Sequence, residues 1–327
     1  MRILCIIRRG GLQLGAMSNN FIHVNHLSEI VEQRPTFVAI GSFDGVHLGH
    51  QAVLKSMVAA AQEAGARTAV LTFFPHPKRV LLNLTDPYYL SSIADRVRWI
   101  ADLGVDIIIT HPFNDDVRTT RAAEFVEQLC QHLDMSQLWG GNFALGYKRE
   151  GDVPFLRRLG EEKGYSVELV NSLVEFDGEL VSSSRIRQSL RNGNMVDVHG
   201  CLGRPYLIHG VIVKGDQRGR TIGFPTANFD FWSEQLLPAN GVYATYVWVD
   251  NDRYQAATNV GVRPTVDGRR MTVEAHLLDF NGDLYGQTLG LEFVAKVRPE
   301  MKFAGLDALK AQIDQDVAEV RSLLKPL

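Results

Sequence analysis

The sequence predicts two domains of different class: an α/β doubly wound domain, then a small antiparallel β-barrel closed by a C-terminal helix. The chain has 327 residues, more than one domain usually holds. Strand and helix patterns alternate in the first part, which implies a parallel sheet with helices on both faces. From residue 206 onward, short strands and turns follow each other with almost no helix, which is typical of a small barrel.

The first domain is expected to be Rossmann-like. Apolar, β-branched runs predict strands at 36–40, 67–74, 105–110, 137–140 and 165–170. Helical periodicity predicts helices at 49–66, 91–103, 121–133 and 155–163, after a lead-in strand and short helix within 21–33. Such sheets bind ligands beyond the carboxyl ends of their strands, so the turn after residue 40 is expected at a binding edge.

A boundary is expected near Asn194, where Asn-Gly-Asn favours a turn. We therefore predict domains at 17–194 and 195–327. A short helix over 195–202 precedes strands at 206–214, 242–249, 254–260, 272–278 and 289–297. The closing helix shows one apolar stripe: Leu306, Leu309, Ile313, Val317, Val320 and Leu324. Its polar face is expected to be solvated: Asp307, Lys310, Asp314 and Asp316.

Composition limits the partners. The net charge of −3 argues against a broad nucleic-acid surface, and no stretch is long and apolar enough to suggest a membrane partner. Three dispersed cysteines without a C-x-x-C motif indicate a reducing, cytoplasmic setting. Residues 1–16 carry no motif and precede a second methionine, Met17, so we expect a non-structural extension. Homo-oligomerisation is left open.

The stretch V-A-I-G-S-F-D-G-V-H-L-G-H-Q organises the first domain. It places His47 and His50 on one face of a first helical turn, where free N–H groups and the helix dipole favour a phosphate. Gly49 leaves room for a ligand to approach the backbone. Two imidazoles there could stabilise charge developing on an α-phosphate, which is nucleotidyl-transfer chemistry. A zinc site or a simple helix cap are the alternative interpretations.

The full motif resembles the nucleotidyltransferase superfamily. Its particular residues are most similar to the adenylyltransferase module of prokaryotic bifunctional riboflavin kinase/FAD synthetases. The resemblance implies that Gly41, Phe43, Gly45 and Gly49 contact the nucleotide, with His47 and His50 catalytic.

Two further segments resemble that module. G-G-N-F-A-L-G puts Asn142 at a nucleotide-binding position, with Leu145 replacing the usual aromatic residue. V-S-S-S-R-I-R puts Ser183, Ser184 and Arg185 at the triphosphate. A plain surface turn and a plain helix cap are the respective alternatives. In T-F-F-P-H-P, Phe74 stands where many members carry an acid.

The second domain resembles the riboflavin kinase family over nearly its whole length, through G-R-P-Y, a glycine-rich charged loop at 215–220, G-F-P-T-A-N and V-E-A-H-L-L-D-F. The resemblance implies that Gly215 and Gly223 contact the nucleotide. Kinase chemistry needs a metal on the phosphates and a base at the attacking hydroxyl. Thr226 and Asn228 are expected at magnesium, and Glu274 is the expected base. Alone, Thr226 would be a structural turn residue and Glu274 a surface charge.

The resemblance implies a transferase with two consecutive magnesium–ATP reactions: riboflavin to FMN, then FMN to FAD with release of pyrophosphate. Two alternatives stay open at this point. One is a riboflavin kinase whose adenylyltransferase domain is impaired, as the departures at Phe74 and Leu145 would allow. The other is a non-enzymatic flavin or nucleotide binder, which retention of Glu274 and Thr226 disfavours. The chain lacks a Walker A motif, which excludes a P-loop kinase.

Overall fold

The computed structural model describes residues 21–141, 143–170, 174–215, 219, 222–265 and 268–324. The expectations for residues 1–16 and for Asn142 lie outside these ranges. Within them the chain forms two compact units. The first unit holds residues 21–86 and Ile93–Val181, and the second unit holds Pro87–Ser92 and everything from Ser182 onward.

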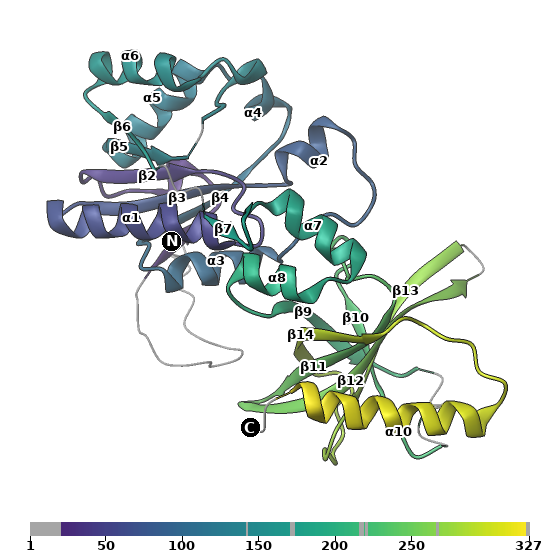
Figure 1. The fold of residues 1–327 in the computed structure, drawn as a ribbon. Helices are drawn as coiled ribbons and strands as arrows, with labels where there is room; N and C mark the ends of the chain where they lie inside the picture. The colour runs from purple at the N-terminus through teal and green to yellow at the C-terminus, as the bar shows by residue number, and fades with distance from the viewer. Residues whose placement is uncertain are drawn as a thin grey trace. The chain divides into compact units, whose positions relative to one another are not determined.

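The first unit is built on one parallel sheet, as predicted (Figure 1). Its strands lie in the order β1-β4-β3-β2-β5-β6. Their bounds are Ile22–Val24 (β1), Thr36–Ile40 (β2), Arg67–Phe74 (β3), Ile107–Pro112 (β4), Met135–Gly140 (β5) and Ser166–Leu169 (β6). The chain leaves β2 toward β3 on one side and returns to β5 on the other. The topological switch point, where such sheets bind ligands, therefore lies between β2 and β5.

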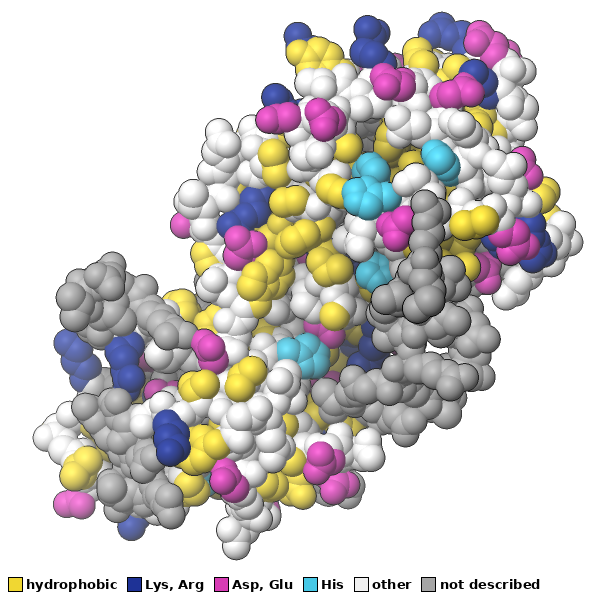
Figure 2. All heavy atoms as spheres, turned by 180° about the vertical axis from the view of Figure 1, so that it is seen from behind, with side chains coloured by type: hydrophobic (Ala, Val, Ile, Leu, Met, Phe, Trp, Pro, Cys, Tyr) yellow, Lys and Arg dark blue, Asp and Glu magenta, His cyan; other side chains and the backbone are white. Residues whose placement is uncertain are grey.

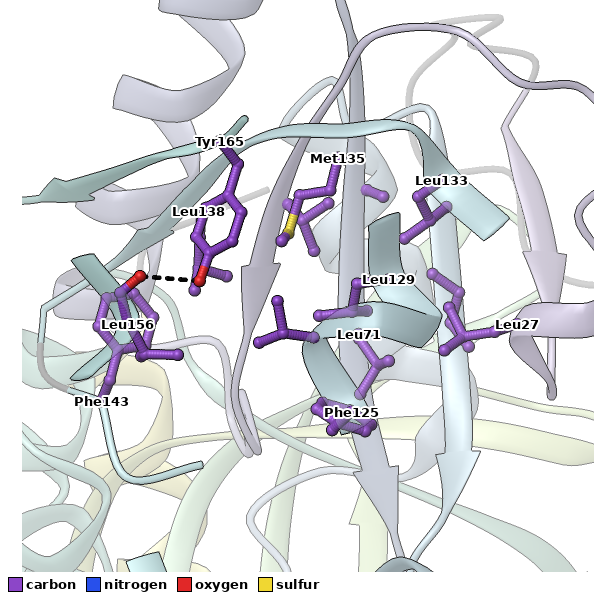
Figure 3. Close-up of a cluster of buried hydrophobic side chains, with 14 of the residues drawn as sticks. Leu27, Leu71, Phe125, Leu129, Leu133, Met135, Leu138, Phe143, Leu156 and Tyr165 are labelled. Atoms are coloured by element: carbon purple, nitrogen blue, oxygen red, sulfur yellow. Dashed lines mark hydrogen bonds between the residues drawn. The ribbon is translucent and has the colours of Figure 1, made fainter. Parts of the chain in front are cut away.

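Helices cover both faces of this sheet because its strands alternate their apolar side chains between two cores. Val38 and Leu71 face the core under α5 (Ala122–Leu133) and α6 (Val153–Lys163), part of which Figure 3 shows. Phe37 and Val70 face the core under α1 (Leu48–Ala64) and α3 (Ile93–Asp102). In the first core the Tyr165 hydroxyl donates to the Leu156 carbonyl at 2.8 Å, so its polar atom is satisfied (Figure 3).

The main segment of the second unit begins with helices α7 (Ser183–Asn192) and α8 (Met195–Leu202). A closed barrel follows, in the order β10-β13-β12-β11-β14-β9 (Figure 1). Its strands are Tyr206–Val213 (β9), Ala227–Phe231 (β10), Gly241–Val249 (β11), Asp252–Thr265 (β12), Gly268–Leu277 (β13) and Thr288–Arg298 (β14), paired antiparallel throughout. Helix α10 (Leu306–Leu323) packs Val320 and Leu324 onto this barrel.

Two predictions for the closing helix are wrong. Asp316, expected on a solvated face, is only 4% exposed. Its carboxylate accepts two hydrogen bonds from Arg298 of β14, at 2.8 and 2.7 Å. Leu306, expected in the buried stripe, is 68% exposed. The Asp316–Arg298 pair therefore clamps the middle of α10 to the barrel, while the start of the helix stays exposed.

Several short elements were not predicted. They are α2 (Pro77–Leu81), α4 (Asp115–Thr119), the hairpin β7 (Glu175–Phe176) with β8 (Glu179–Leu180), and strand β10. The described residues also include the single-turn helices η1 (Leu27–Glu29) and η2 (Tyr147–Arg149). On the face of the molecule in Figure 2, basic and acidic side chains are interspersed rather than gathered by sign.

Residues 87–92 pack on the second unit although they precede α3 in the sequence. The Tyr89 side chain is 0% exposed, and its ring centroid lies 4.7 Å from that of Trp232. The backbone N–H groups of Tyr88 and Tyr89 donate to the Glu234 carbonyl. The boundary near Asn194 stays a prediction, and the second unit includes residues 87–92, which lie far from that boundary in the sequence.

Candidate active sites

The turn that follows β2 has a strained backbone. Phe43 and Val46 have φ angles of 44° and 39°, which side chains rarely adopt, and Gly45 has a φ of 80°. A Cβ at Gly41 would lie 3.1 Å from the Phe43 ring. Backbone strain of this kind persists only where the surroundings hold it in place.

A buried ion pair holds the turn. Arg96 of α3 is 0% exposed and Asp44 is 1% exposed, and Arg96 Nη2 lies 3.0 Å from Asp44 Oδ1. Arg96 Nη1 also donates to Thr72 Oγ1 at 3.3 Å, and Thr72 donates to the Ser42 carbonyl at 2.8 Å. Asp44 is thus fixed by a cation, so its role here is to hold the turn in place.

His47 and His50 lie together at the start of α1. Their rings stack with centroids 3.6 Å apart. His47 is the N-cap residue, and its Nδ1 accepts from the backbone N–H of His50 at 3.4 Å. Because an accepting imidazole nitrogen carries no proton, the proton of the neutral His47 ring lies on Nε2. A Cβ at Gly49 would lie 3.2 Å from the His47 ring, so glycine leaves this ring its space.

The segment after β5 lies on the other side of the switch point. A Cβ at Gly140 would lie 2.7 Å from the ring of buried Phe143, so this position needs glycine. Leu145 packs against the core under α5 and bridges to Gly151. Leu145, which replaces the aromatic residue usual in the family motif, therefore packs against the core.

The T-F-F-P-H-P stretch ends β3 and starts α2. The Phe74–Pro75 peptide is cis. His76 is the N-cap of α2, and its Nδ1 accepts from the Lys78 backbone N–H at 3.1 Å. Phe74 is partly buried, and its carbonyl accepts from the Phe113 backbone N–H.

The serine–arginine segment opens α7, in the second unit. Ser182 caps the helix by accepting from the Arg185 backbone N–H at 3.2 Å. The Arg185 guanidinium is paired with the Asp197 carboxylate of α8, which also accepts from Ser189. Arg187 donates to the Tyr88 carbonyl at 2.8 Å and lies over the Tyr88 ring. Asp197 was not identified from the sequence as the partner of Arg185. The available signal was weak: two opposite charges twelve residues apart in the sequence.

The residues predicted for the second site gather around β10 and β13. Asn228 on β10 pairs in register with Glu274 on β13, so the two side chains point to the same face. Thr226 lies two residues before Asn228. A Cβ at Gly215 would come within 2.5 Å of the Asn228 amide, so the glycine-rich loop starts in close contact with Asn228.

A cavity of about 460 Å³ opens beside Thr226. Its lining combines apolar and polar surface in similar amounts: Ile212, Pro225, Ala227, Leu277, Phe280, Leu284 and Tyr285, with Thr226, Asn281, Gly282 and Asp283. Its volume lies within the range of small-molecule pockets. His276 Nδ1 lies 2.8 Å from the Pro225 carbonyl, so His276 supports the turn that carries Thr226. Gly223 has a φ of 94°, which glycine favours.

The structure thus brings two groups of predicted residues together. Gly41, Phe43, Gly45, His47, Gly49 and His50 form one turn, and Gly215, Thr226, Asn228 and Glu274 meet on the barrel. No cluster of three or more His, Cys, Asp or Glu side chains in the described ranges is placed to hold a metal ion. A zinc site at His47 and His50 has no support there.

Two protein-family models match this chain and define the class of each half. The family model described as FAD synthetase matches residues 29–185, and the model described as riboflavin kinase matches residues 202–324. A solved structure named macrolide-efflux protein, from Streptococcus pneumoniae, is 29% identical with a TM-score of 0.84. The match covers 92% of this chain and 98% of that one. Among the described residues, no helix is long and apolar enough to cross a membrane.

Full-length relatives then give the particular family. Proteins named bifunctional riboflavin kinase/FMN adenylyltransferase match over most of their length in several bacteria. The Pseudomonas fluorescens protein is 38% identical (90% of this chain, 95% of the relative), and the Bacillus subtilis protein 35% identical (91% and 96%). The Escherichia coli K12 protein is 36% identical (93% and 98%). The chain belongs to the family of bifunctional riboflavin kinase/FMN adenylyltransferases.

Proposed function

We propose that this chain phosphorylates riboflavin to FMN in its barrel and joins FMN to AMP in its α/β sheet, which yields FAD. The observation that carries the proposal is similarity to bifunctional enzymes over about nine-tenths of the chain, with a polar site in each half. The substrates are riboflavin, FMN and ATP. The three dispersed cysteines favour a cytoplasmic setting, and the described Cys130 and Cys201 are free thiols.

In the kinase step, the riboflavin 5′-hydroxyl attacks the γ-phosphorus of ATP and ADP leaves. Glu274 accepts the hydroxyl proton, as a carboxylate within reach of the hydroxyl can. Thr226, which lines the cavity, would lie at the ATP phosphates together with Gly215 and Gly223. Thr226 and Asn228 would hold Mg²⁺ through their side-chain oxygens, since Mg²⁺ is a hard cation that takes oxygen ligands and binds substrate phosphates at phosphoryl-transfer sites. The ion would neutralise charge on the transferring phosphates.

In the adenylyl step, a phosphate oxygen of FMN attacks the α-phosphorus of a second ATP and pyrophosphate leaves. The Nε2–H of His47 and the adjacent His50 ring donate to the α-phosphate oxygens. Their stacked placement at a helix N-terminus fixes these donors before charge develops. Asp44 and Arg96 hold the turn, and Asn142, Ser183, Ser184 and Arg185 complete the nucleotide contacts.

For Arg185 the proposal requires an exchange of partners. Its guanidinium pairs with Asp197 in this structure. A triphosphate is a stronger bidentate partner for a guanidinium than one carboxylate, because it offers more charge and more oxygens. Arg185 would then leave Asp197 when ATP binds.

The test is an incubation of the purified protein with riboflavin, ATP and MgCl₂, with the flavins separated by chromatography over time. FMN is expected to rise first and FAD to follow. Accumulation of FMN without FAD would support a kinase with an impaired adenylyltransferase domain. Unchanged riboflavin would mean that the chain only binds flavins or nucleotides, and the proposal would be wrong.

A further inference from the structure

We propose that Asn259 of β12 binds the ribityl hydroxyls of riboflavin, on the side of Glu274 opposite the magnesium and ATP ligands. This inference deepens the proposed kinase function and rests on it. It assigns a substrate-binding role to a residue for which the motif gave no role.

The strand register places Asn259 beside Glu274. Glu274 on β13 pairs with Asn228 on one side and with Asn259 on the other. Residues paired across antiparallel strands point to the same face, with Cβ atoms about 4.5–5.5 Å apart. Val273 and Ala275, the neighbours of Glu274 in its strand, are buried at 1% and 0% exposure. The row Asn228–Glu274–Asn259 therefore faces away from the barrel interior.

The three side chains of this row are all partly buried. Across the described ranges, none of them makes a hydrogen bond or ion pair with another residue. Polar groups with restricted access to water usually have a protein partner. A row of such groups without internal partners is therefore arranged for a polar ligand.

The positions of the three residues across the sheet determine which substrate each one can contact. Thr226 and Asn228, the proposed magnesium ligands, lie on the β10 side of Glu274. In phosphoryl transfer the attacking and leaving oxygens lie roughly in line on opposite sides of phosphorus. With ATP on the β10 side, the acceptor alcohol approaches from the β12 side, where Asn259 stands.

The chemistry of a carboxamide suits this task. It offers two N–H donors and one acceptor oxygen, which match the hydroxyls of a polyol chain. It is neutral, so it places no charge beside the base. Gly261, two residues further on β12, keeps the approach open: a Cβ there would lie 3.1 Å from Asn259 Nδ2 and 2.6 Å from Glu300 Oε1.

Asn259→Ala tests the inference in the full-length protein. Loss of hydrogen bonds to a neutral substrate group should raise the riboflavin KM about five- to tenfold, with the ATP KM unchanged. Binding titrations by flavin fluorescence compare riboflavin with lumiflavin, which has the same ring system but a methyl group instead of the ribityl chain. The variant should bind riboflavin more weakly and lumiflavin as well as the wild type does.

Asn251→Ala is the matched control, since Asn251 is an exposed turn residue at the other end of β12. Asn259→Leu, similar in shape but without polar atoms, is the second variant, and calorimetric unfolding of the barrel unit reports on the folding of each protein. A wild-type riboflavin KM in either folded variant, or equal weakening of riboflavin and lumiflavin, overturns the inference. A wild-type protein that makes no FMN would instead refute the proposed function itself.

Discussion

Removal of Arg96 should destabilise the first unit far more than removal of an exposed arginine. Arg96→Met leaves the Asp44 carboxylate, which is 1% exposed, without the guanidinium 3.0 Å away. Breaking a buried ion pair on one side costs about 3–5 kcal/mol. For a unit of this size, 1 kcal/mol shifts Tm by about 2–4 °C, so the unfolding transition should fall by about 6–20 °C.

The assay is calorimetric unfolding of the full-length protein, with both activities measured at low temperature. FAD formation should fall because the turn that carries His47 loses its support, while FMN formation stays near wild type. Asp44→Leu combined with Arg96→Met should recover part of the lost stability, because no uncompensated charge is then buried.

Arg118→Met is the control. Arg118 pairs with Asp115 at 3.0 Å, but with side-chain exposures of 44% and 88%. Exposed pairs contribute about 0–1 kcal/mol. If Arg96→Met unfolds at the same temperature as Arg118→Met, the buried pair does not hold this turn, and the structural role given to Asp44 is wrong.

Three further predictions follow from the sites and their supports. His47→Ala should reduce FAD formation about 100-fold and leave FMN formation unchanged in a chromatographic assay, and an equal loss of both would contradict separate sites. Tyr89→Ala should destabilise the second unit by about 3–5 kcal/mol in urea unfolding, because a buried ring against Trp232 is removed; no effect would mean that residues 87–92 are not needed there. Burial lowers the pKa of His23 and His111 below the ordinary 6.5, and the charge of a neighbouring histidine lowers the pKa of His111 further. As pH falls, the two imidazoles take up protons in the unfolded chain before they do so in the folded protein. The contribution of the neutral histidines to the free energy of unfolding should therefore be complete above about pH 6.5 and be lost as pH falls through their lowered pKa values in the folded protein. The double variant His23→Gln, His111→Gln should show a weaker dependence of stability on pH.

Much of the fold was predictable because the periodicities are strong. Strand β3 begins and ends at the predicted residues, and five of the barrel strands lie within a few residues of the prediction. Strand β10 was missed because Asn228 and Asp230 are poor strand formers and glycine and proline precede them. Its alternating Ala227, Phe229 and Phe231 were nevertheless a period-two signal. The Asp177–Gly178 pair was likewise an unused signal for the β7–β8 hairpin.

Part of the candidate site could be predicted because some of its residues lie close together in the sequence. Local motifs placed His47 and His50 in one turn, because residues three apart share a helix face. Long-range partners leave no local signature, so the Arg96–Asp44 pair and the contact of Tyr89 with Trp232 could not be read from one sequence. The burial of Asp316 was hidden for the same reason, since its partner Arg298 lies on another element.

The central claim is that one chain carries two separate sites that act in sequence. The most direct measurement gives a Glu274→Gln protein either riboflavin or FMN, each with ATP and MgCl₂, and follows FAD. Gln fills the space of Glu without accepting the hydroxyl proton, so no FMN or FAD should form from riboflavin. FAD should form from FMN at the wild-type rate. FAD formation from riboflavin, or a folded protein that makes no FAD from FMN, would contradict the account.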